Sequence, residues 1–223
     1  MKRISAALCG ATILAGAAAH AGTTTLDFES GVPAQFSGSG TVTGVGGLGG
    51  FNGFSGSFLW NTGTTGVSSV FTFSGLDPHS EITVSFGLAL IDSWDGVNGT
   101  PAPDYFNLLA DGAEIFDISV ANTSGTIEDI PAEATGRSSP GNIFGSSYTD
   151  TLFNVSLTFA HSASELTLTM FADGTGWQGS SDESWGIDNL TVTTSAPAVP
   201  LPAGLPLLLA GLGGMALLRG RRT

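Results

Sequence analysis

Cysteine and positive charge are what this sequence has least of. Its 223 residues include one cysteine, Cys9, and six Lys or Arg residues against 19 Asp or Glu residues. Five of the six basic residues lie in the first three or last five positions, so Arg137 is the only one between them. Nucleic-acid binding needs Lys and Arg to neutralise phosphates. The composition therefore excludes nucleic acid as a partner.

The lack of cysteine also limits how the chain can be stabilised. Exported domains are commonly held together by disulfides, but a chain whose single cysteine is Cys9 cannot form one internally. An acidic chain attracts divalent cations, and calcium takes oxygen ligands from carboxylates and backbone carbonyls. A bound calcium ion is the natural substitute for a disulfide here.

Catalytic signatures are missing as well. The sequence has neither G-x-S-x-G nor H-E-x-x-H, the patterns of serine hydrolases and zinc proteases. Residues 44–49 match G-x-G-x-x-G, but no helix is expected after them, as a dinucleotide site requires. We therefore expect a protein that is not an enzyme. The alternative is an envelope polysaccharide hydrolase that uses paired carboxylates.

The first 21 residues have the pattern of a signal peptide. Lys2 and Arg3 precede an apolar run over residues 4–19, and Ala19-His20-Ala21 fits the small-x-small cleavage pattern. This arrangement predicts export and a mature chain that begins at Gly22.

The middle of the chain, residues 22–194, predicts an all-β domain. Apolar and polar residues alternate over residues 82–90, 153–159 and 166–170, which is the period of a half-buried strand. Asp111-Gly112 is a hairpin-turn signal. The count and spacing favour a two-sheet, jelly-roll-like sandwich, with long loops over residues 31–66 and 121–150. Nine strands are expected, near residues 24–29, 41–45, 67–73, 81–91, 104–110, 113–120, 151–160, 165–171 and 185–194.

The last expected strand contains a change of parity. Trp185 and Ile187 share one parity, and Leu190 and Val192 the other, so a β-bulge between them would keep all four inward. The core should also include Phe86, Leu88, Phe153, Val155, Leu157, Leu166 and Leu168.

Acidic residues stand at both ends of this domain. Leu26-Asp27-Phe28-Glu29 opens it, and Ile187-Asp188-Asn189-Leu190 lies in its last strand. These two motifs resemble those of jelly-roll adhesion and carbohydrate-binding modules, and the resemblance implies a structural calcium ion where the two ends meet. We expect Glu29 and Asp188 as ligands. The alternative is that both are solvated strand-end acids.

Two further segments combine acids and aromatic residues. Asp92 and Asp95 follow the clearest strand and could hold a second cation. Trp94 and Tyr105 lie near them in the sequence, and Trp177 lies in a Gly-rich turn. These three aromatic side chains could bind a sugar ring, or the tryptophans could close the end of the sandwich core.

The last 25 residues have three parts in fixed order. Val199-Pro200-Leu201-Pro202-Ala203 is followed by an uncharged apolar run over residues 205–218 and then by Arg219, Arg221 and Arg222. This order resembles the VPLPA-CTERM sorting signals of Gram-negative bacteria. The resemblance implies processing by an exosortase-like membrane transpeptidase, a transmembrane helix at about residues 204–218, and a linker over residues 195–198. A permanent tail anchor is the alternative.

These features predict an exported protein, held in the membrane through its C-terminal segment before processing. It would then be delivered to the outer surface or extracellular matrix as a binding or structural module. Exopolysaccharide is the expected ligand, because such sorting systems commonly accompany exopolysaccharide production. An inert structural matrix protein is a further alternative.

Overall fold

The computed structural model describes residues 21–145, 147–180 and 182–195. The chain divides into two units, and the described residues belong to the unit formed by residues 21–196. Residues 1–20 of the expected signal peptide and the whole expected sorting signal lie outside the described residues. Within the described ranges no helix is long and apolar enough to cross a membrane.

The described residues form strands, loops and one short 3₁₀ turn at Gly46–Leu48. The all-β prediction is therefore confirmed. The strands are β1 (Thr23–Leu26), β2 (Phe36–Gly38), β3 (Thr41–Gly44), β4 (Ser57–Asn61), β5 (Ser68–Ser74), β6 (Glu81–Asp92), β7 (Tyr105–Ala110), β8 (Ala113–Ile118), β9 (Ala134–Gly141), β10 (Asp150–Ala160), β11 (Glu165–Asp173) and β12 (Glu183–Thr194).

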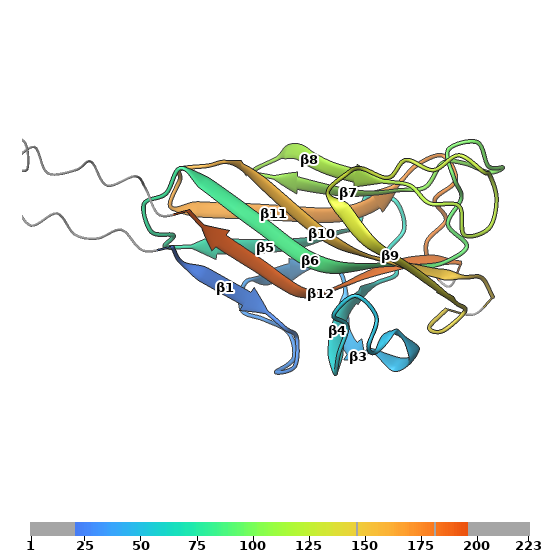
Figure 1. Ribbon diagram of the computed structural model, residues 1–223, viewed down its shortest axis with the longest axis horizontal. Helices are drawn as coiled ribbons and strands as arrows, with labels where there is room; N and C mark the ends of the chain where they lie inside the picture. The colour runs from blue at the N-terminus through green and yellow to red at the C-terminus, as the bar shows by residue number, and fades with distance from the viewer. Residues whose placement is uncertain (1–20, 146, 181, 196–223) are drawn as a thin grey trace, which may run out of the picture. The chain divides into compact units, whose positions relative to one another are not determined.

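The strands make two antiparallel sheets. The seven-stranded sheet has the order β3-β4-β12-β6-β10-β9, with β1 also paired to β12, and the five-stranded sheet has the order β2-β5-β11-β7-β8. In Figure 1 the diagonal strands β6, β10 and β12 lie across β5 and β11 of the other sheet. The two sheets form a sandwich.

The main core lies between the two sheets. All seven residues expected in it are buried, among them Phe153 and Leu157 of β10 and Leu166 and Leu168 of β11. Alternation at period two placed them correctly because one face of each strand points into the sandwich.

A second, smaller core covers the outer face of the larger sheet. Ala89 and Ile91 of β6 pack there with Leu48, Phe54 and other residues, while Leu88 and Leu90 of the same strand face the main core. The end of β6 is thus buried on both faces, because the segment around residues 45–54 folds over the sheet.

The expected bulge in β12 is present. The register between β12 and β6 shifts between Asp188 and Thr191, and Asn189 has a positive φ of 55°. Trp185 and Ile187 lie before the shift, Leu190 within it and Val192 after it, and all four belong to the main core. The bulge therefore lets the apolar side chains on both sides of it point into the main core.

Of the twelve strands in the described residues, nine were expected from the sequence and three were not. β2 and β4 lie in the expected loop over residues 31–66, and β9 lies in the expected loop over residues 121–150. The two long loops are therefore corrected. Each contains at least one strand of a sheet.

The described part of the chain begins and ends at the same end of the sandwich. The Gly22 backbone N–H donates to Thr194 Oγ1 at 2.9 Å. Thr194 pairs with Ile82, while Glu183 pairs with Asp92 at the other end of the same two strands. The residues that follow Asp92 and precede Glu183 therefore lie far from the point where the chain enters and leaves the domain.

Candidate functional site

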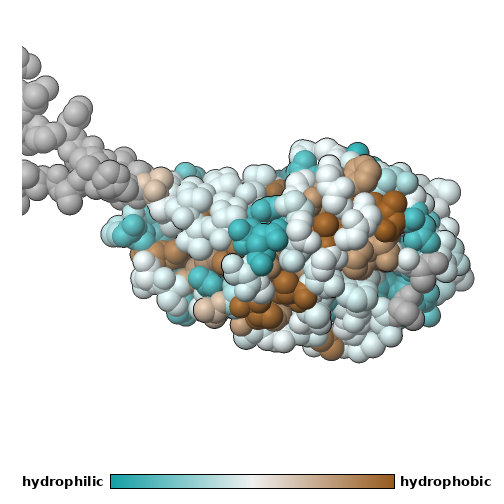
Figure 2. Space-filling model, turned by 90° about the horizontal axis from the view of Figure 1, so that it is seen from below, coloured by the Kyte–Doolittle hydropathy of each residue, from teal (hydrophilic) through white to brown (hydrophobic). Residues whose placement is uncertain are grey.

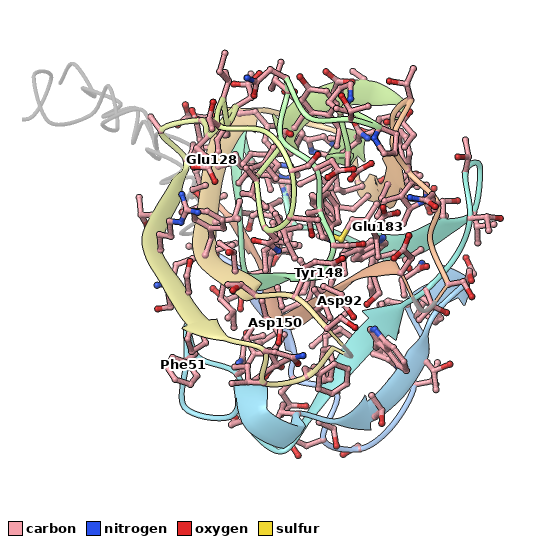
Figure 3. The ribbon with its side chains drawn as sticks, turned by 90° about the vertical axis from the view of Figure 1, so that its right-hand side faces the viewer. Phe51, Asp92, Glu128, Tyr148, Asp150 and Glu183 are labelled. Atoms are coloured by element: carbon pink, nitrogen blue, oxygen red, sulfur yellow. The ribbon has the colours of Figure 1, made fainter. Side chains whose placement is uncertain are left out.

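Three carboxylates meet at the far end of the sandwich. Asp95 follows β6, Asp104 immediately precedes β7, and Glu183 is the first residue of β12. One carboxylate oxygen of each lies within 4.8 Å of the others. Figure 3 looks onto this end, with Glu183 labelled among the side chains. Since β7 belongs to the smaller sheet and β6 and β12 to the larger one, the cluster joins both sheets.

The Asp95 and Asp104 side chains are buried, at 4% and 0% exposure. The Asp95 backbone N–H donates to Asp104 Oδ2 at 2.6 Å, and the Ser124 N–H donates to Asp95 Oδ1 at 3.1 Å. Asp104 Oδ1 is buried and has no hydrogen-bond partner. Such an atom is unusual, because buried polar groups normally find one.

Glu183 is 1% exposed. Its Oε2 accepts hydrogen bonds from the backbone N–H groups of Gln178, at 2.6 Å, and Gly179, at 3.0 Å. These two donors hold the carboxylate in one orientation. They belong to the segment between β11 and β12, so Glu183 also fixes the chain on that side of the cluster.

Burial raises the pKa values of Asp104 and Glu183. The pKa of Asp104 is raised to about 7, first because burial disfavours its charged form, while the hydrogen bond from Asp95 lowers it and the Glu183 charge raises it. Burial also raises the pKa of Glu183, against the two backbone hydrogen bonds. Strongly shifted acids often mark functional sites.

No basic side chain of the described residues compensates this negative charge. Arg137 is the only lysine or arginine in that part of the chain, and its guanidinium pairs with Glu128 at 2.6 Å. Three buried carboxylates without a protein cation require bound protons or a bound metal ion.

Glu29 and Asp188, the predicted calcium ligands, approach the same short segment. Ser57 N–H donates to Glu29 Oε1 at 3.1 Å, and Ser55 N–H donates to Asp188 Oδ2 at 3.0 Å. Burial raises the pKa of Asp188 to about 6, and the charges of Glu29 and Asp27 add to this effect. The two ends of the domain are therefore neighbours. Asp188 alternates with Ile187, which faces the main core, so its side chain lies on the outer face of the larger sheet.

The other two predicted metal ligands lie in different places. Asp95 belongs to the buried cluster. Asp92 instead orders the loop after β9, because its Oδ1 accepts hydrogen bonds from the N–H groups of Ser147 and Tyr148 at 3.2 and 2.8 Å. Asp150 Oδ1 in turn accepts from the Asp92 N–H at 3.1 Å, and Figure 3 labels both acids.

The predicted sugar-binding tryptophans are in the core. Trp94 is 0% exposed and Trp177 is 7% exposed, with their ring centroids 5.2 Å apart. Trp94 Nε1 donates to the Ser184 carbonyl at 2.9 Å. Their ring faces are therefore not open to a sugar, which corrects that expectation, and they close the end of the sandwich instead. Tyr105 is half-buried at the start of β7.

A surface hollow that sequence reading missed lies beside this end. It has a volume of about 190 Å³ and is lined by Trp60, Ile91, Asp92, Phe144, Gly145, Ser180 and Ser184. Trp60 and Phe144 pack edge to face at 5.3 Å. Trp60 Nε1 donates to Ser184 Oγ at 2.9 Å, which fixes the indole ring. The short apolar run of β4 could have indicated this hollow from the sequence, but it lies within residues 31–66, which were expected to form a loop.

The two histidines of the described residues contact each other. His79 Nε2 and His161 Nδ1 are 2.7 Å apart, and His161 Nε2 lies 3.2 Å from Asp111 Oδ2. The pair joins the turn before β6 to the turn after β10. None of these contacts places a serine hydroxyl or a cysteine thiol beside either imidazole ring.

No family model matches this sequence, and no curated protein matches it either. Solved structures with some similarity include an exo-β-1,3-galactanase from Phanerochaete chrysosporium with β-1,3-galactotriose, at 16% identity and a TM-score of 0.36, covering 79% of this chain and 29% of that one. A Paenibacillus sp. cycloisomaltooligosaccharide glucanotransferase complexed with cycloisomaltoheptaose has 14% identity and a TM-score of 0.36, covering 75% of this chain and 18% of that one.

A Clostridium thermocellum endo-1,4-β-D-xylanase complexed with xylohexaose has 12% identity and a TM-score of 0.36, covering 75% of this chain and 27% of that one. The present chain thus spans less than a third of each of these proteins.

Proposed function

We propose that this chain is an exported, non-catalytic module that binds polysaccharide at the cell envelope or in the extracellular matrix. The observation that carries the proposal is the hollow around Trp60 and Phe144. Sugar sites combine aromatic faces with a few fixed polar groups, and Ser180 and Ser184 supply hydroxyls beside these two rings.

The hollow is preformed, which favours binding. The hydrogen bond from Trp60 to Ser184 and the edge-to-face packing on Phe144 already restrain the indole. Binding therefore costs little side-chain ordering. The face seen in Figure 2 is mostly pale, with hydrophobic residues in small separate patches, which suits contact with a hydrated polymer better than contact with a broad apolar surface.

Burial of Asp104 and Glu183 argues against a hydrolytic role for these two acids. A glycosidase needs two carboxyl groups on either side of the scissile bond. Asp104 and Glu183 have raised pKa values, but at 0% and 1% exposure neither can reach a glycosidic bond from its present position.

Calcium at Glu29 and Asp188 forms part of this proposal. The two acids converge on the segment over residues 55–57, and the pKa of Asp188 is raised by burial and by the nearby negative charge of Glu29. A calcium ion held by their carboxylates would neutralise that charge and fix the first strand against the last one.

Delivery by a sorting system rests on the literal Val199–Ala203 motif. An exosortase-like membrane transpeptidase would recognise this motif and release the domain from its C-terminal segment. The far end of the sandwich, which carries the hollow, lies away from Gly22 and Thr194, where leader and tail connect.

The test is binding of the exported protein to a glycan array and to the host's exopolysaccharide. We expect binding that Trp60→Ala abolishes, with the melting temperature checked for each variant. Phe36→Ala is the matched control, because it removes a half-buried aromatic residue from the smaller sheet and should leave binding unchanged. Equal binding by Trp60→Ala would contradict the assigned site. Release of reducing sugar would instead support the hydrolase alternative.

A further inference from the structure

We propose that Asp95, Asp104 and Glu183 form a calcium site that fastens the two sheets together at the far end of the sandwich. This site is separate from the Glu29–Asp188 pair and does not depend on polysaccharide binding. The three carboxylates come from the end of β6, the start of β7 and the start of β12. A cation among them would therefore link three segments of two sheets.

The strongest observation is the unsatisfied oxygen of Asp104. The carboxylate belongs to the cluster, is fully buried, and its Oδ1 has no hydrogen-bond partner. Leaving a buried acceptor unpaired destabilises the folded state, and more so when the group is charged. A metal ion bound to Oδ1 would remove this destabilisation.

The surrounding chain closes tightly on this oxygen. A Cβ added at Gly176 would lie 2.8 Å from Asp104 Oδ1 and 3.0 Å from the Ala102 Cα. Only glycine at position 176 lets this backbone lie so close to the Asp104 carboxylate. Gly176 N–H also donates to the Pro103 carbonyl at 3.1 Å, so the segment before Asp104 and the turn after β11 are held against each other around the carboxylate.

The donor set selects the kind of metal. All three side chains are carboxylates, and no His or Cys belongs to the cluster, so a soft or borderline metal such as copper or zinc is disfavoured. Calcium accepts six to eight oxygens in flexible geometry, whereas magnesium demands a near-ideal octahedron. Carboxylates from three separate segments fit the flexible coordination of calcium better than the strict octahedron of magnesium. Backbone carbonyls or water would complete the calcium coordination shell.

Tryptophans beside the cluster make the site measurable. Trp94 precedes Asp95 in the chain, and its Nε1 donates to the carbonyl of Ser184, the residue after Glu183. Terbium(III) replaces calcium at oxygen sites and luminesces when a nearby excited tryptophan transfers energy to it. The purified full-length chain, freed of metal with a chelator, should therefore give a tryptophan-sensitised terbium signal that calcium displaces.

Asp104→Asn tests the ligand directly. It should weaken terbium binding at this site by about tenfold or more, since loss of an outer-shell partner alone typically costs 10–100-fold. Calcium should still raise the melting temperature of the Glu29→Gln variant, because that variant keeps the cluster. Adding Asp104→Asn to it should abolish this remaining rise. Asp77→Asn, which removes the same charge from an exposed acid, should change neither quantity.

Two results would overturn the proposal. One is the absence of a sensitised terbium signal in the unmodified chain, a measurement that needs no variant to fold. The other is a folded Asp104→Asn protein that keeps the wild-type signal and calcium response, which would mean that the three acids share protons rather than a metal. Because Glu29→Gln removes only the other pair, failure at that pair and failure at this cluster are distinguishable.

Discussion

Leu157 shows how much a single side chain of the main core contributes. It lies in β10, is 6% exposed, and belongs to the cluster between the two sheets. Leu157→Ala should lower the free energy of unfolding by about 2–5 kcal/mol, because truncation leaves a cavity in a close-packed core. Urea denaturation of the variant and the wild type measures this change in the free energy of unfolding. Ser156→Ala, at the exposed neighbouring position, should stay within about 0.5 kcal/mol, and an equally small loss for Leu157→Ala would place that residue outside the core.

Glu128 and Arg137 give the domain a small pH-dependent contribution. The hydrogen bond from Arg137 holds the pKa of Glu128 below its ordinary value of 4.5. A group whose pKa is lowered by folding stabilises the fold above its unfolded pKa, and this stabilisation disappears as the pH falls through the folded pKa. Glu128→Gln should therefore be less stable than the wild type at neutral pH and equal to it in acid.

The expected size is that of a partly exposed ion pair, about 0.2–1 kcal/mol. Urea denaturation of both proteins at about pH 7 and at about pH 3, below the usual range for glutamate, measures the difference. Arg137→Gln should behave in the same way, because it removes the other partner. A difference that persists unchanged in acid would mean that Glu128 acts through packing and not through charge.

At the scale of elements, the β7–β8 hairpin depends on backbone conformation. Asp111 and Gly112 both have positive φ, 49° and 82°, as a two-residue hairpin turn of this kind requires. Gly112→Ala should cost roughly 1 kcal/mol, because alanine avoids that region although nothing lies within 4 Å of the added Cβ.

The measurement is thermal unfolding followed by circular dichroism. Gly44→Ala is the matched control. Gly44 also lies in the sheet region, its φ is not positive, and the nearest atom to an added Cβ is 3.8 Å away. We expect little change for the control. Equal melting temperatures for Gly112→Ala and the wild type would show that the turn tolerates a side chain.

The strands that sequence reading missed lacked the alternating pattern. In β4, Phe58 packs in the second core and Leu59 in the main core, so consecutive residues are both buried and no period of two appears. β9 is an edge strand that contains Pro140 and two glycines and is largely exposed. Proline is tolerated at an edge, but on a sequence alone it indicates a loop.

The buried acids show a different limit of sequence reading. Asp95 was a predicted ligand because it stands in an acidic loop, but Glu183 lies far away in the chain. The two meet because β12 pairs with β6 so that Glu183 faces Asp92. Only strand order and register bring such residues together. Glu29 and Asp188 were predicted as a pair because a resemblance, and not a pattern of residues, linked the two ends.

At the scale of the whole domain, the chain ends and the candidate sites lie at opposite ends of the sandwich. The chain enters and leaves beside Gly22 and Thr194, where these residues hydrogen-bond. The hollow, Asp92 and the buried acids lie at the other ends of β6 and β12. The hollow and the buried acids therefore lie at the end of the domain opposite to Gly22 and Thr194.

We propose that the C-terminal segment determines whether the domain stays attached to a membrane. A permanent anchor needs about 20 apolar residues to span the bilayer core, but the unbroken run over residues 205–218 is shorter and contains Gly211, Gly213 and Gly214. Each glycine weakens a helix by roughly 1 kcal/mol relative to alanine. A short, glycine-interrupted span is better suited to holding the Val199–Ala203 motif temporarily before a membrane protease.

We therefore expect the mature protein to lack residues 204–223 and deletion of these residues to release it in soluble form. Pro202→Ala should block processing without unfolding the domain, because the last strand of the described residues ends at Thr194, before the motif. Intact-mass measurement on envelope material from a host with the exosortase decides between the two fates of the tail. Full-length protein that still carries Arg222 would mean a permanent anchor, because the terminal arginines are removed only if the transpeptidase cuts at the motif.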